Sequence, residues 1–380
     1  MSASMLTNVY VGSGTGIFKQ VEVEKKVAVN YADFNKLNKE EEIVCMCWAN
    51  QQQTQIHLGL RNQTVKTFDT EEKCFKSSKE CFGGEGALKG IGVHGDRIIT
   101  CSESGIMKVW DNLKDDAHFE INVGENVCKM RKNAEKPNVF ATGGKENDLK
   151  IWDINNKDEP IFKAKNVKND FLDLQVPVWM TDVQFLPKST KVLTGTGHHQ
   201  IRIYDPDSQR RPVFEMTYDE YPITAVEVST DGRSVFVGNT QGRLARIDLR
   251  NKQVLKVYPG FAGSIRCISL HPTEPMVATC GLDRFLRLHN VHTADVAHKV
   301  YLKSKLNCLL VKCTEHFQKE NNSSESVRNS SKVKQTKEDA DSDDDVWDQI
   351  SPLNEDEPKK KTTKRLKNEG KKSKKKARVK

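Results

Sequence analysis

A short sequence pattern returns seven times along this chain of 380 residues. Each copy has two apolar, strand-like stretches around a turn of Gly, Asn or Asp, and the second stretch carries a polar residue framed by apolar ones. The clearest copies run from Ala141 to Asp153 and from Ile99 to Asp111. The anchor positions are Val21, Phe68, Trp110, Trp152, Tyr204, Ile247 and His289, with spacings of 47, 42, 42, 52, 43 and 42 residues. Such a period is typical of similar units packed side by side.

The period and the Trp-Asp ending predict that each copy is one four-stranded blade of a WD-repeat β-propeller. Apolar runs at 44–48, 88–93, 127–130, 183–186, 223–228 and 265–270 precede all copies but the first and are expected to be the innermost strands. A spare run at 306–311 follows the last copy. We therefore expect an all-β fold, a seven-bladed propeller over residues 1–313, with strand 306–311 closing the first blade so that no open sheet edge remains.

The remaining residues, 314–380, differ in composition from the repeats. Residues 338–348 are acidic, whereas residues 359–380 hold 13 Lys or Arg and one acid, so the overall net charge of +8 hides a mildly acidic body with a basic tail. Residues 314–380 contain too few apolar side chains to offset the conformational entropy that the chain would lose on folding, so the sequence predicts disorder.

The basic blocks of this tail predict nuclear import and contact with RNA phosphates. The alternative is a solvated tail that only aids solubility. The residues concerned are Lys359, Lys360, Lys361, Lys364, Arg365, Lys371, Lys372, Lys374, Lys375, Lys376 and Arg378. Ser342 precedes three aspartates and is a candidate for phosphorylation, which would add negative charge beside the basic run.

Several classes of function find no support in the sequence. There is no apolar run long enough to cross a membrane. No Cys-x-x-Cys pair marks a zinc site, and His198-His199 has no carboxylate or Cys partner at useful spacing. The stretch Gly12–Gly16 resembles a phosphate loop but lacks the following Lys and helix, so we expect a hairpin turn. We therefore expect a chain that is not an enzyme and that has no cofactor and no metal.

The Trp-Asp endings are expected to be structural. The aromatic residues should pack between neighbouring blades, and the acids should accept hydrogen bonds from turn donors. The residues are Trp110, Asp111, Trp152, Asp153, Tyr204 and Asp205.

The spacing of 52 residues is the informative irregularity, because its extra length falls at 163–179. This segment mixes cations, amides and aromatic residues, as protein and RNA interfaces do, and loops on a rigid scaffold commonly carry function. We predict a partner-binding loop; the alternative is a long outer strand followed by a packing loop. Its candidate residues are Lys163, Lys165, Lys168, Asn169, Asp170, Phe171 and Trp179.

Several stretches resemble the WD repeat-containing protein 74 family, across about residues 8 to 312. They are Ala141–Asn147, Ala164–Asp170, Pro177–Trp179, Gly238–Gly242, Cys280–Arg284 and Lys299–Ser304. The resemblance implies a nucleolar scaffold in assembly of the large (60S) ribosomal subunit and in pre-rRNA processing. It also implies as partners pre-60S ribosome assembly factors, a nuclear AAA ATPase resembling valosin-containing protein and an exosome-associated RNA helicase, with pre-rRNA as a further candidate.

Two other functions stay open as alternatives. Asp248-Leu249-Arg250 resembles the short Asp-x-Arg ending of some substrate receptors of cullin ubiquitin ligases. A chromatin-binding propeller is the second alternative, and it would need an acidic or aromatic pocket at the centre of the ring.

Overall fold

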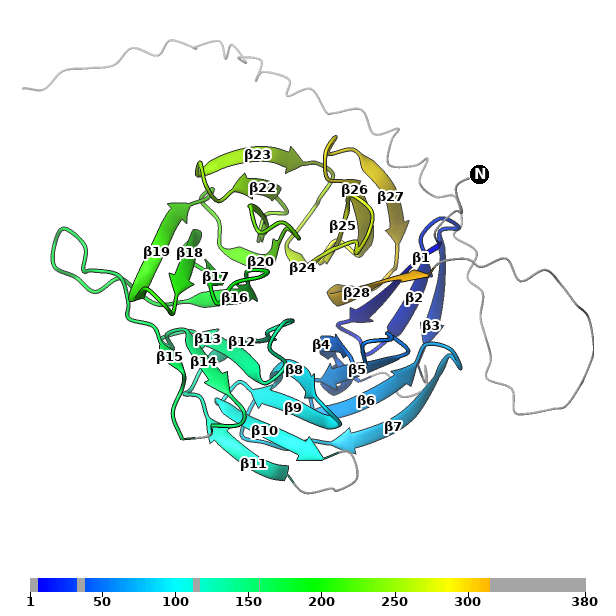
Figure 1. The fold of residues 1–380 in the computed structure, drawn as a ribbon. Coiled ribbons are helices and arrows are strands. Elements are labelled where there is room, and N and C mark those ends of the chain that lie inside the picture. The colour runs from blue at the N-terminus through cyan, green and yellow to red at the C-terminus, as the bar shows by residue number, and fades with distance from the viewer. Residues whose placement is uncertain (1–5, 33–37, 112–116, 157, 315–380) are drawn as a thin grey trace, which may run out of the picture. The chain divides into compact units, whose positions relative to one another are not determined.

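The computed structural model describes residues 6–32, 38–111, 117–156 and 158–314. In these residues the chain consists of β-strands and one short 3-10 helix, η2 (Lys39–Glu41), which lies between the first and second blades. The strands form seven four-stranded antiparallel sheets arranged around a common axis (Figure 1). The prediction of an all-β, seven-bladed propeller is confirmed.

The seven blades follow one another around the ring, each with its innermost strand named first and its outermost strand last. Blade 1 contains β28 (Leu306–Thr314), β1 (Leu6–Ser13), β2 (Phe18–Glu22) and β3 (Val27–Tyr31). Blade 2 contains β4 (Ile43–Trp48), β5 (Gln55–Leu60), β6 (Thr64–Asp69) and β7 (Cys74–Glu80). Blade 3 contains β8 (Leu88–His94), β9 (Arg97–Ser102), β10 (Ile106–Asp111) and β11 (Ala117–Asn122). Blade 4 contains β12 (Val127–Lys132), β13 (Val139–Gly144), β14 (Lys150–Asp153) and β15 (Phe162–Lys163). Blade 5 contains β16 (Met180–Phe185), β17 (Val192–Thr196), β18 (Gln200–Asp205) and β19 (Gln209–Thr217). Blade 6 contains β20 (Ile223–Val228), β21 (Ser234–Asn239), β22 (Leu244–Asp248) and β23 (Gln253–Tyr258). Blade 7 contains β24 (Ile265–Leu270), β25 (Met276–Gly281), β26 (Phe285–Asn290) and β27 (Val296–Tyr301).

Blade 1 combines strands from opposite ends of the described chain. β28 pairs antiparallel with β1, so that Val311 lies opposite Val9 and Leu309 lies opposite Val11. β2 pairs along the other edge of β1. Because β1 has a partner on each side, it does not present a row of unpaired backbone groups.

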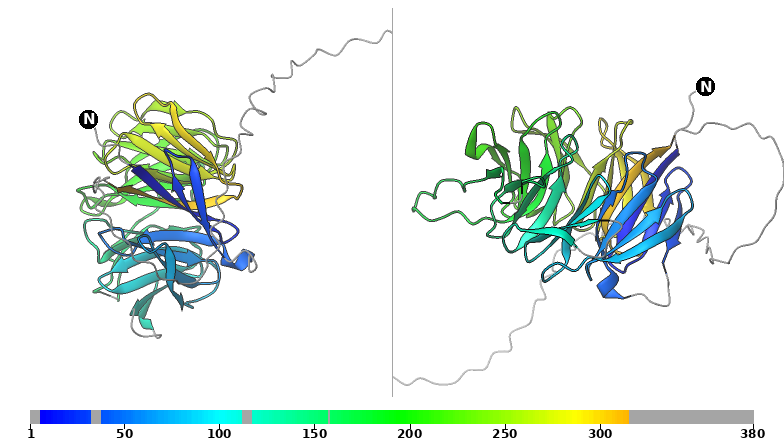
Figure 2. Two further views of the ribbon diagram at one scale, coloured as in Figure 1. Left: turned by 90° about the vertical axis from the view of Figure 1, so that its right-hand side faces the viewer. Right: turned by 60° about the horizontal axis from the view of Figure 1, so that its bottom comes forward.

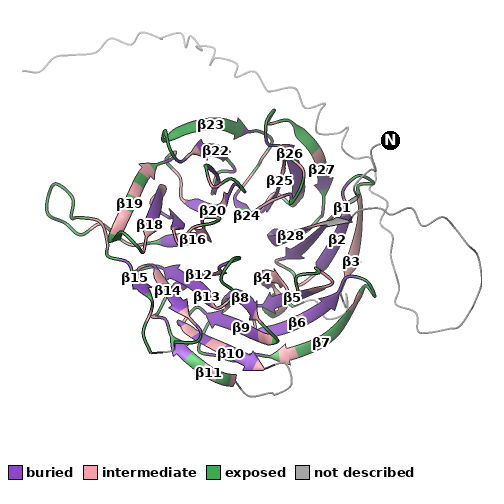
Figure 3. Ribbon diagram, viewed as in Figure 1, coloured by how far each residue is buried: buried purple, intermediate pink, exposed green. Residues whose placement is uncertain are grey.

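Burial falls from the middle strands of a blade to its outer strand (Figure 3). β13 and β21 are buried along their whole length, because neighbouring blades cover both of their faces. The outermost strands β7 and β23 are mostly exposed. The core is therefore divided into apolar layers between successive blades.

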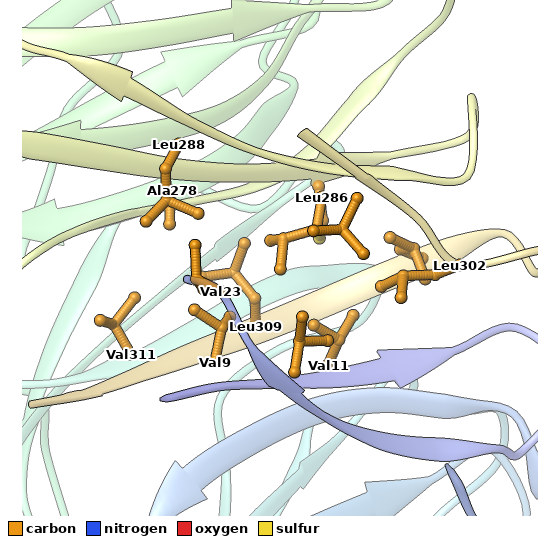
Figure 4. Packing of buried hydrophobic residues seen from close by; sticks show 13 residues of the cluster. Val9, Val11, Val23, Ala278, Leu286, Leu288, Leu302, Leu309 and Val311 are labelled. Atoms are coloured by element: carbon orange, nitrogen blue, oxygen red, sulfur yellow. The ribbon is translucent and has the colours of Figure 1, made fainter. Parts of the chain in front are cut away.

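The layer between blades 7 and 1 shows how these blades hold each other (Figure 4). Leu286 and Leu288 of β26 belong to one buried cluster with Val9 and Val11 of β1. Leu309 of β28 joins the same cluster. Burying a side chain of this size stabilises the fold by about 1.5–3 kcal/mol, so the closing strand contributes packing as well as hydrogen bonds.

The tryptophans of the repeats occupy the same kind of layer. Trp110 is buried against residues of blades 2 and 3, and its Nε1–H donates to Thr100 Oγ1 at 2.8 Å. Trp152 is buried between blades 3 and 4, and its Nε1–H donates to Thr142 Oγ1 at 3.0 Å. Tyr204 is buried in the layer between blades 4 and 5. The N–H group of each buried indole thus has a hydrogen-bond partner that replaces water.

The acids that follow these aromatic residues serve two purposes. Asp153 Oδ1 accepts from the backbone N–H of Asn155 at 2.9 Å, and Asp205 Oδ1 accepts from the N–H of Asp207 at 3.2 Å. These are side-chain-to-backbone turns of the Asx type. Asp111 instead forms an ion pair with Arg97, whose Nε–H donates to Oδ1 at 2.8 Å.

A charged cluster joins the inner strands of blades 4, 5 and 6. Asp182 on β16 is 2% exposed, and its carboxylate lies 3.4 Å from Nη2 of Arg131 and 3.7 Å from Nζ of Lys129. The backbone N–H groups of Val183 and Val226 each donate to it at 3.0 Å. Burial alone would raise the pKa of Asp182, but the two cations and the two N–H donors lower it below its ordinary value.

This cluster also explains a difference in strand bounds. The apolar pattern predicts an inner strand at 183–186, whereas β16 begins at Met180. Thr181 and Asp182 interrupt the apolar run, and the sequence gives no sign that partners on neighbouring blades neutralise the buried carboxylate.

Glu227 on β20 gives this region a pH dependence. Burial raises the pKa of Glu227 to about 7 from 4.5, against the opposing effect of Arg131 and with a further increase from Asp182. Between these two values the folded chain binds more protons than the unfolded chain, so stability falls as pH rises. We expect Glu227→Gln to remove roughly 1–3 kcal/mol of this loss. Urea unfolding at pH 5 and pH 8 checks this: the variant should gain relative to the parent mainly at pH 8, and an equal effect at both values would contradict the assignment.

Candidate partner-binding site

The extra residues of the irregular repeat form a loop at the rim of the ring. The insertion loop (residues 163–179) connects β15 to β16, and β15 itself is only two residues long. The loop projects from the ring between blades 4 and 5 (Figures 1 and 2). Blade 4 therefore has a short outer strand, and most of the added length is loop.

Hydrogen bonds attach the base of the insertion loop to the outer strand of blade 5. Arg210 of β19 donates through Nε–H to the carbonyl of Lys163 at 2.8 Å, and its own carbonyl accepts from the N–H of Lys165 at 2.8 Å. Arg211 donates through Nε–H to the carbonyl of Asn166 at 3.2 Å. Asn166 in turn donates through its amide to the carbonyl of Val176 at 2.6 Å and so joins the two arms of the loop.

The tip of the loop is a turn ordered by its own polar side chains. Oδ1 of Asp170 accepts from the backbone N–H groups of Leu172 and Leu174, both at 2.9 Å. Asn169 donates to Oδ1 of Asp173 at 2.9 Å. Phe171 is 94% exposed, and Leu172 and Leu174 are also exposed. The polar residues thus hold three apolar side chains in water, which is the arrangement of a preformed contact surface.

Trp179 anchors the far end of the loop. Its ring lies against Gly197, where a Cβ would stand 2.2 Å from Cε3 of the indole, and it meets His198 edge-to-face at 5.9 Å between ring centres. Its carbonyl accepts from the N–H of Gly197 at 2.8 Å. Trp179 is 36% exposed, so part of the indole faces solvent.

A pocket of about 900 Å³ lies between the base of the loop and β19. We call it the insertion pocket. Five cations and two carboxylates line it: Lys163, Lys165, Lys168, Arg210, Arg211, Asp148 and Asp173. Among the described residues, none of these five cations forms an ion pair with a carboxylate. The pocket therefore presents unneutralised positive charge.

Asp148 is the exception within this positive environment. Its Oδ1 is buried and has no hydrogen-bond partner among the described residues. Burial raises the pKa of Asp148, against the opposing effect of Lys150, Lys163, Arg202 and Arg210. A buried acceptor without a donor is costly. Because Asp148 lines the pocket, its carboxylate favours a ligand that brings a donor.

The predicted site residues thus separate into three places. Lys163, Lys165, Lys168 and Asn169 line the insertion pocket. Asp170 and Phe171 lie in the tip, and Trp179 lies at the anchored end of the loop.

Sequence reasoning missed the contribution of blade 5 to this site. Arg210 and Arg211 follow Gln209, the first residue of β19, more than 30 residues after the loop, and Asp148 precedes the loop. The Arg-Arg pair could have indicated this contribution, because it lies in the outer strand of the blade that follows the insertion. Outer strands of successive blades are neighbours at the rim of a ring.

Other predicted features fall elsewhere. The basic tail residues from Lys359 to Arg378 and Ser342 lie outside the described residues. In the part of the chain that the structure describes, no group of three or more His, Cys, Asp and Glu side chains could hold a metal ion. No helix among the described residues is long and apolar enough to cross a membrane.

The Asp-x-Arg stretch has a local structural explanation. Oδ1 of Asp248 accepts from the backbone N–H of Arg250 at 2.7 Å, and the side-chain amide of Asn251 donates to Oδ2 at 3.2 Å. This is the same turn that Asp153 forms at the end of β14. This turn gives Asp248 a structural role at the end of β22.

Comparison with known proteins identifies the family. Residues 252–290 match the family model "WD domain, G-beta repeat", a stretch from the outer strand of blade 6 to β26 of blade 7. The chain is 47% identical over 325 residues to WD repeat-containing protein 74 of Bos taurus and 48% identical over 325 residues to that of Homo sapiens, covering 84% of each chain in both cases. It is 32% identical over 209 residues to the ribosome biogenesis protein NSA1 of Meyerozyma guilliermondii, covering 46% of this chain and 52% of that protein. The chain belongs to the WD repeat-containing protein 74 family.

Proposed function

We propose that this chain is a non-enzymatic scaffold in the assembly of the large ribosomal subunit, and that its insertion loop binds a protein partner there. The observation that carries the proposal is the ordered tip of the loop, which holds Phe171, Leu172 and Leu174 in water. Exposed aromatic and aliphatic anchors on a rigid base are typical of the centre of a protein interface. A folded ring keeps such an anchor in place at low entropic cost.

The relatives support the assembly role. Proteins named for ribosome biogenesis in several fungi are similar to about half of this chain, and 28% identity over 205 residues links it to the nsa1 protein of Schizosaccharomyces pombe. Within this proposal the partners are pre-60S assembly factors, with an AAA ATPase resembling valosin-containing protein and an exosome-associated RNA helicase acting on the same particles. The place of action is the nucleus and nucleolus.

The basic tail has a separate role in the proposal. Residues 359–380 carry 13 Lys or Arg, which suits nuclear import and weak attachment to pre-rRNA phosphates. Two weak contacts on one chain raise each other's effective concentration. Phosphorylation of Ser342 would reduce the tail's contribution.

The test replaces the apolar tip in the full chain. Phe171→Asp combined with Leu172→Asp should weaken association with large-subunit precursors at least ~30-fold, because a buried interface anchor contributes about 2 kcal/mol or more. The measurement is gradient sedimentation of nuclear extract, probed for the protein and for pre-rRNA, with and without ribonuclease.

Phe82→Asp is the matched control, because Phe82 is 58% exposed and lies in another loop. Thermal melting should show that all three proteins remain folded. Co-sedimentation of the tip variant at the parent's level would contradict the docking role of the loop, and migration of the parent as a small free complex would contradict the assembly role.

A further inference from the structure

The insertion pocket differs in charge from another hollow on the same two blades. That second pocket, of about 470 Å³, is lined by Lys136, Lys188 and Lys191 and by three acids, Glu135, Asp205 and Asp207. Lys191 pairs with Asp205 at 3.2 Å. The insertion pocket has five cations against two carboxylates, and the described residues offer its cations no ion-pair partner. Cations and acids are therefore equal in number in the second pocket, whereas the insertion pocket has an excess of three positive charges for an anion.

The two arginines are held in a fixed orientation within it. Arg210 and Arg211 each use Nε–H to donate to a carbonyl of the loop, at 2.8 and 3.2 Å. Their Nη groups have no partner among the described residues. A guanidinium oriented in this way presents two N–H donors side by side, and this geometry fits the oxygens of a phosphate.

The remaining polar groups of the pocket distinguish between kinds of anion. Oδ1 of Asp148 is a buried acceptor without a donor, and the amide of Gln175 has no hydrogen-bond partner among the described residues. The carboxylate of an acidic side chain would bring no donor for Asp148. A ribonucleotide brings a phosphate for the cations and also a 2′-hydroxyl and base amino groups, which can donate to Asp148.

We propose that the insertion pocket binds the sugar-phosphate backbone of single-stranded RNA, with phosphates at Lys165, Lys168 and the two arginines and a 2′-hydroxyl that donates to Asp148. The inference rests on the proposed function for the origin of the RNA, and it deepens that function by placing RNA at the base of the loop whose tip binds protein. A single strand of RNA is flexible enough to bend into a pocket at the rim of the ring, whereas a rigid duplex is not.

The first experiment uses the full chain and a fluorescent mixed-sequence RNA of about 12 nucleotides. Lys165→Gln with Lys168→Gln removes two charges that make no side-chain hydrogen bond within the described part of the fold. The variant should bind at least about fivefold more weakly at low salt, and the slope of log K against log salt should decrease by about 1.4, since each lost contact on a single strand contributes about 0.7. The matched control is Lys136→Gln with Lys188→Gln, which removes the same charge from the second pocket. Equal effects of the two pairs would overturn the proposal.

Two further measurements locate the strand and identify its chemistry. Photo-crosslinking with 4-thiouridine RNA should mark peptides containing residues 163–175 or 210–211, and crosslinks confined to 359–380 would overturn the proposal. Asp148→Ala should bring the RNA-to-DNA affinity ratio close to one without weakening DNA binding, because it removes only the acceptor. Polyglutamate that competes as well as RNA of equal charge would show an acidic-peptide site instead. If these tests fail while the Phe171 and Leu172 variant still loses precursor association, the pocket assignment is wrong and the scaffold function stands.

Discussion

A chain shortened to end at Ser304 will not unfold in a single cooperative transition, because it lacks β28. This strand completes blade 1 by pairing with β1. Leu306, Leu309 and Val311 of β28 belong to the buried layer between blades 7 and 1. At about 1.5–3 kcal/mol for each such side chain, the loss is comparable with the total stability of ~5–15 kcal/mol that a typical domain has.

β28 also holds the neighbouring blade. The side-chain amide of Asn307 donates to Oε1 of Glu42 at 2.9 Å and to the carbonyl of Ile43 at 3.0 Å, at the start of blade 2. The measurement is thermal unfolding followed by circular dichroism, with a chain ending at Thr314 as the control that lacks only the later residues. If the chain ending at Ser304 unfolded cooperatively at a temperature near that of the control, the result would contradict this prediction. It would show that the ring closes with only three strands in blade 1.

Asp182→Ala will lower the free energy of unfolding by about 3–5 kcal/mol. The substitution leaves the charges of Arg131 and Lys129 without their carboxylate partner and removes the acceptor of two backbone N–H groups. The two cations are only partly exposed, so water replaces the lost carboxylate incompletely, and the two N–H groups lose their acceptor. Urea unfolding at pH 7 measures the effect.

Two companion substitutions show whether the charge is responsible. Asp182→Asn keeps the size and one acceptor oxygen, so it should lose less than Asp182→Ala. Asp96→Ala changes an exposed carboxylate in the turn after β8 and should stay within about 0.5 kcal/mol of the parent. An Asp182→Ala variant as stable as the Asp96 control would mean that this cluster does not hold blades 4, 5 and 6 together.

The propeller could be predicted from the sequence because the apolar pattern that specifies each blade lies within a short stretch of the chain and is repeated. Each blade must bury two apolar middle strands, and this requirement places similar apolar runs at similar distances along the chain. The same logic led to the expectation that the spare run at 306–311 belongs to blade 1. In the structure, β28 pairs with β1.

The buried charges were not predictable in this way. Asp182 looks like a polar interruption of a strand, because its partners Arg131 and Lys129 lie about 50 residues earlier in the sequence. The same holds for Arg210 and Arg211, which meet the insertion loop only because successive blades stand side by side. A single sequence gives the type of each residue. These contacts depend instead on which residues of the neighbouring blade lie opposite, and the sequence pattern does not give that.

The insertion loop lies between these cases. Its existence followed from one spacing of 52 residues, but its shape did not. The ordered tip depends on hydrogen bonds that Asp170 accepts from Leu172 and Leu174, and such turns are one of several conformations open to a polar segment.

The pairing of β28 with β1 also determines how the ring would respond to mechanical force. The C-terminal end of β28, at Thr314, lies opposite Leu6, and the pairs follow in order toward Leu306. A force applied to the residues that follow Thr314 would break the backbone hydrogen bonds between β28 and β1 one pair after another, and not all at the same time. Once β28 had left, β1 would present an open edge and the layer against blade 7 would lose Leu309 and Val311. A motor that threads polypeptide from this side would therefore begin at β28, the strand that completes blade 1.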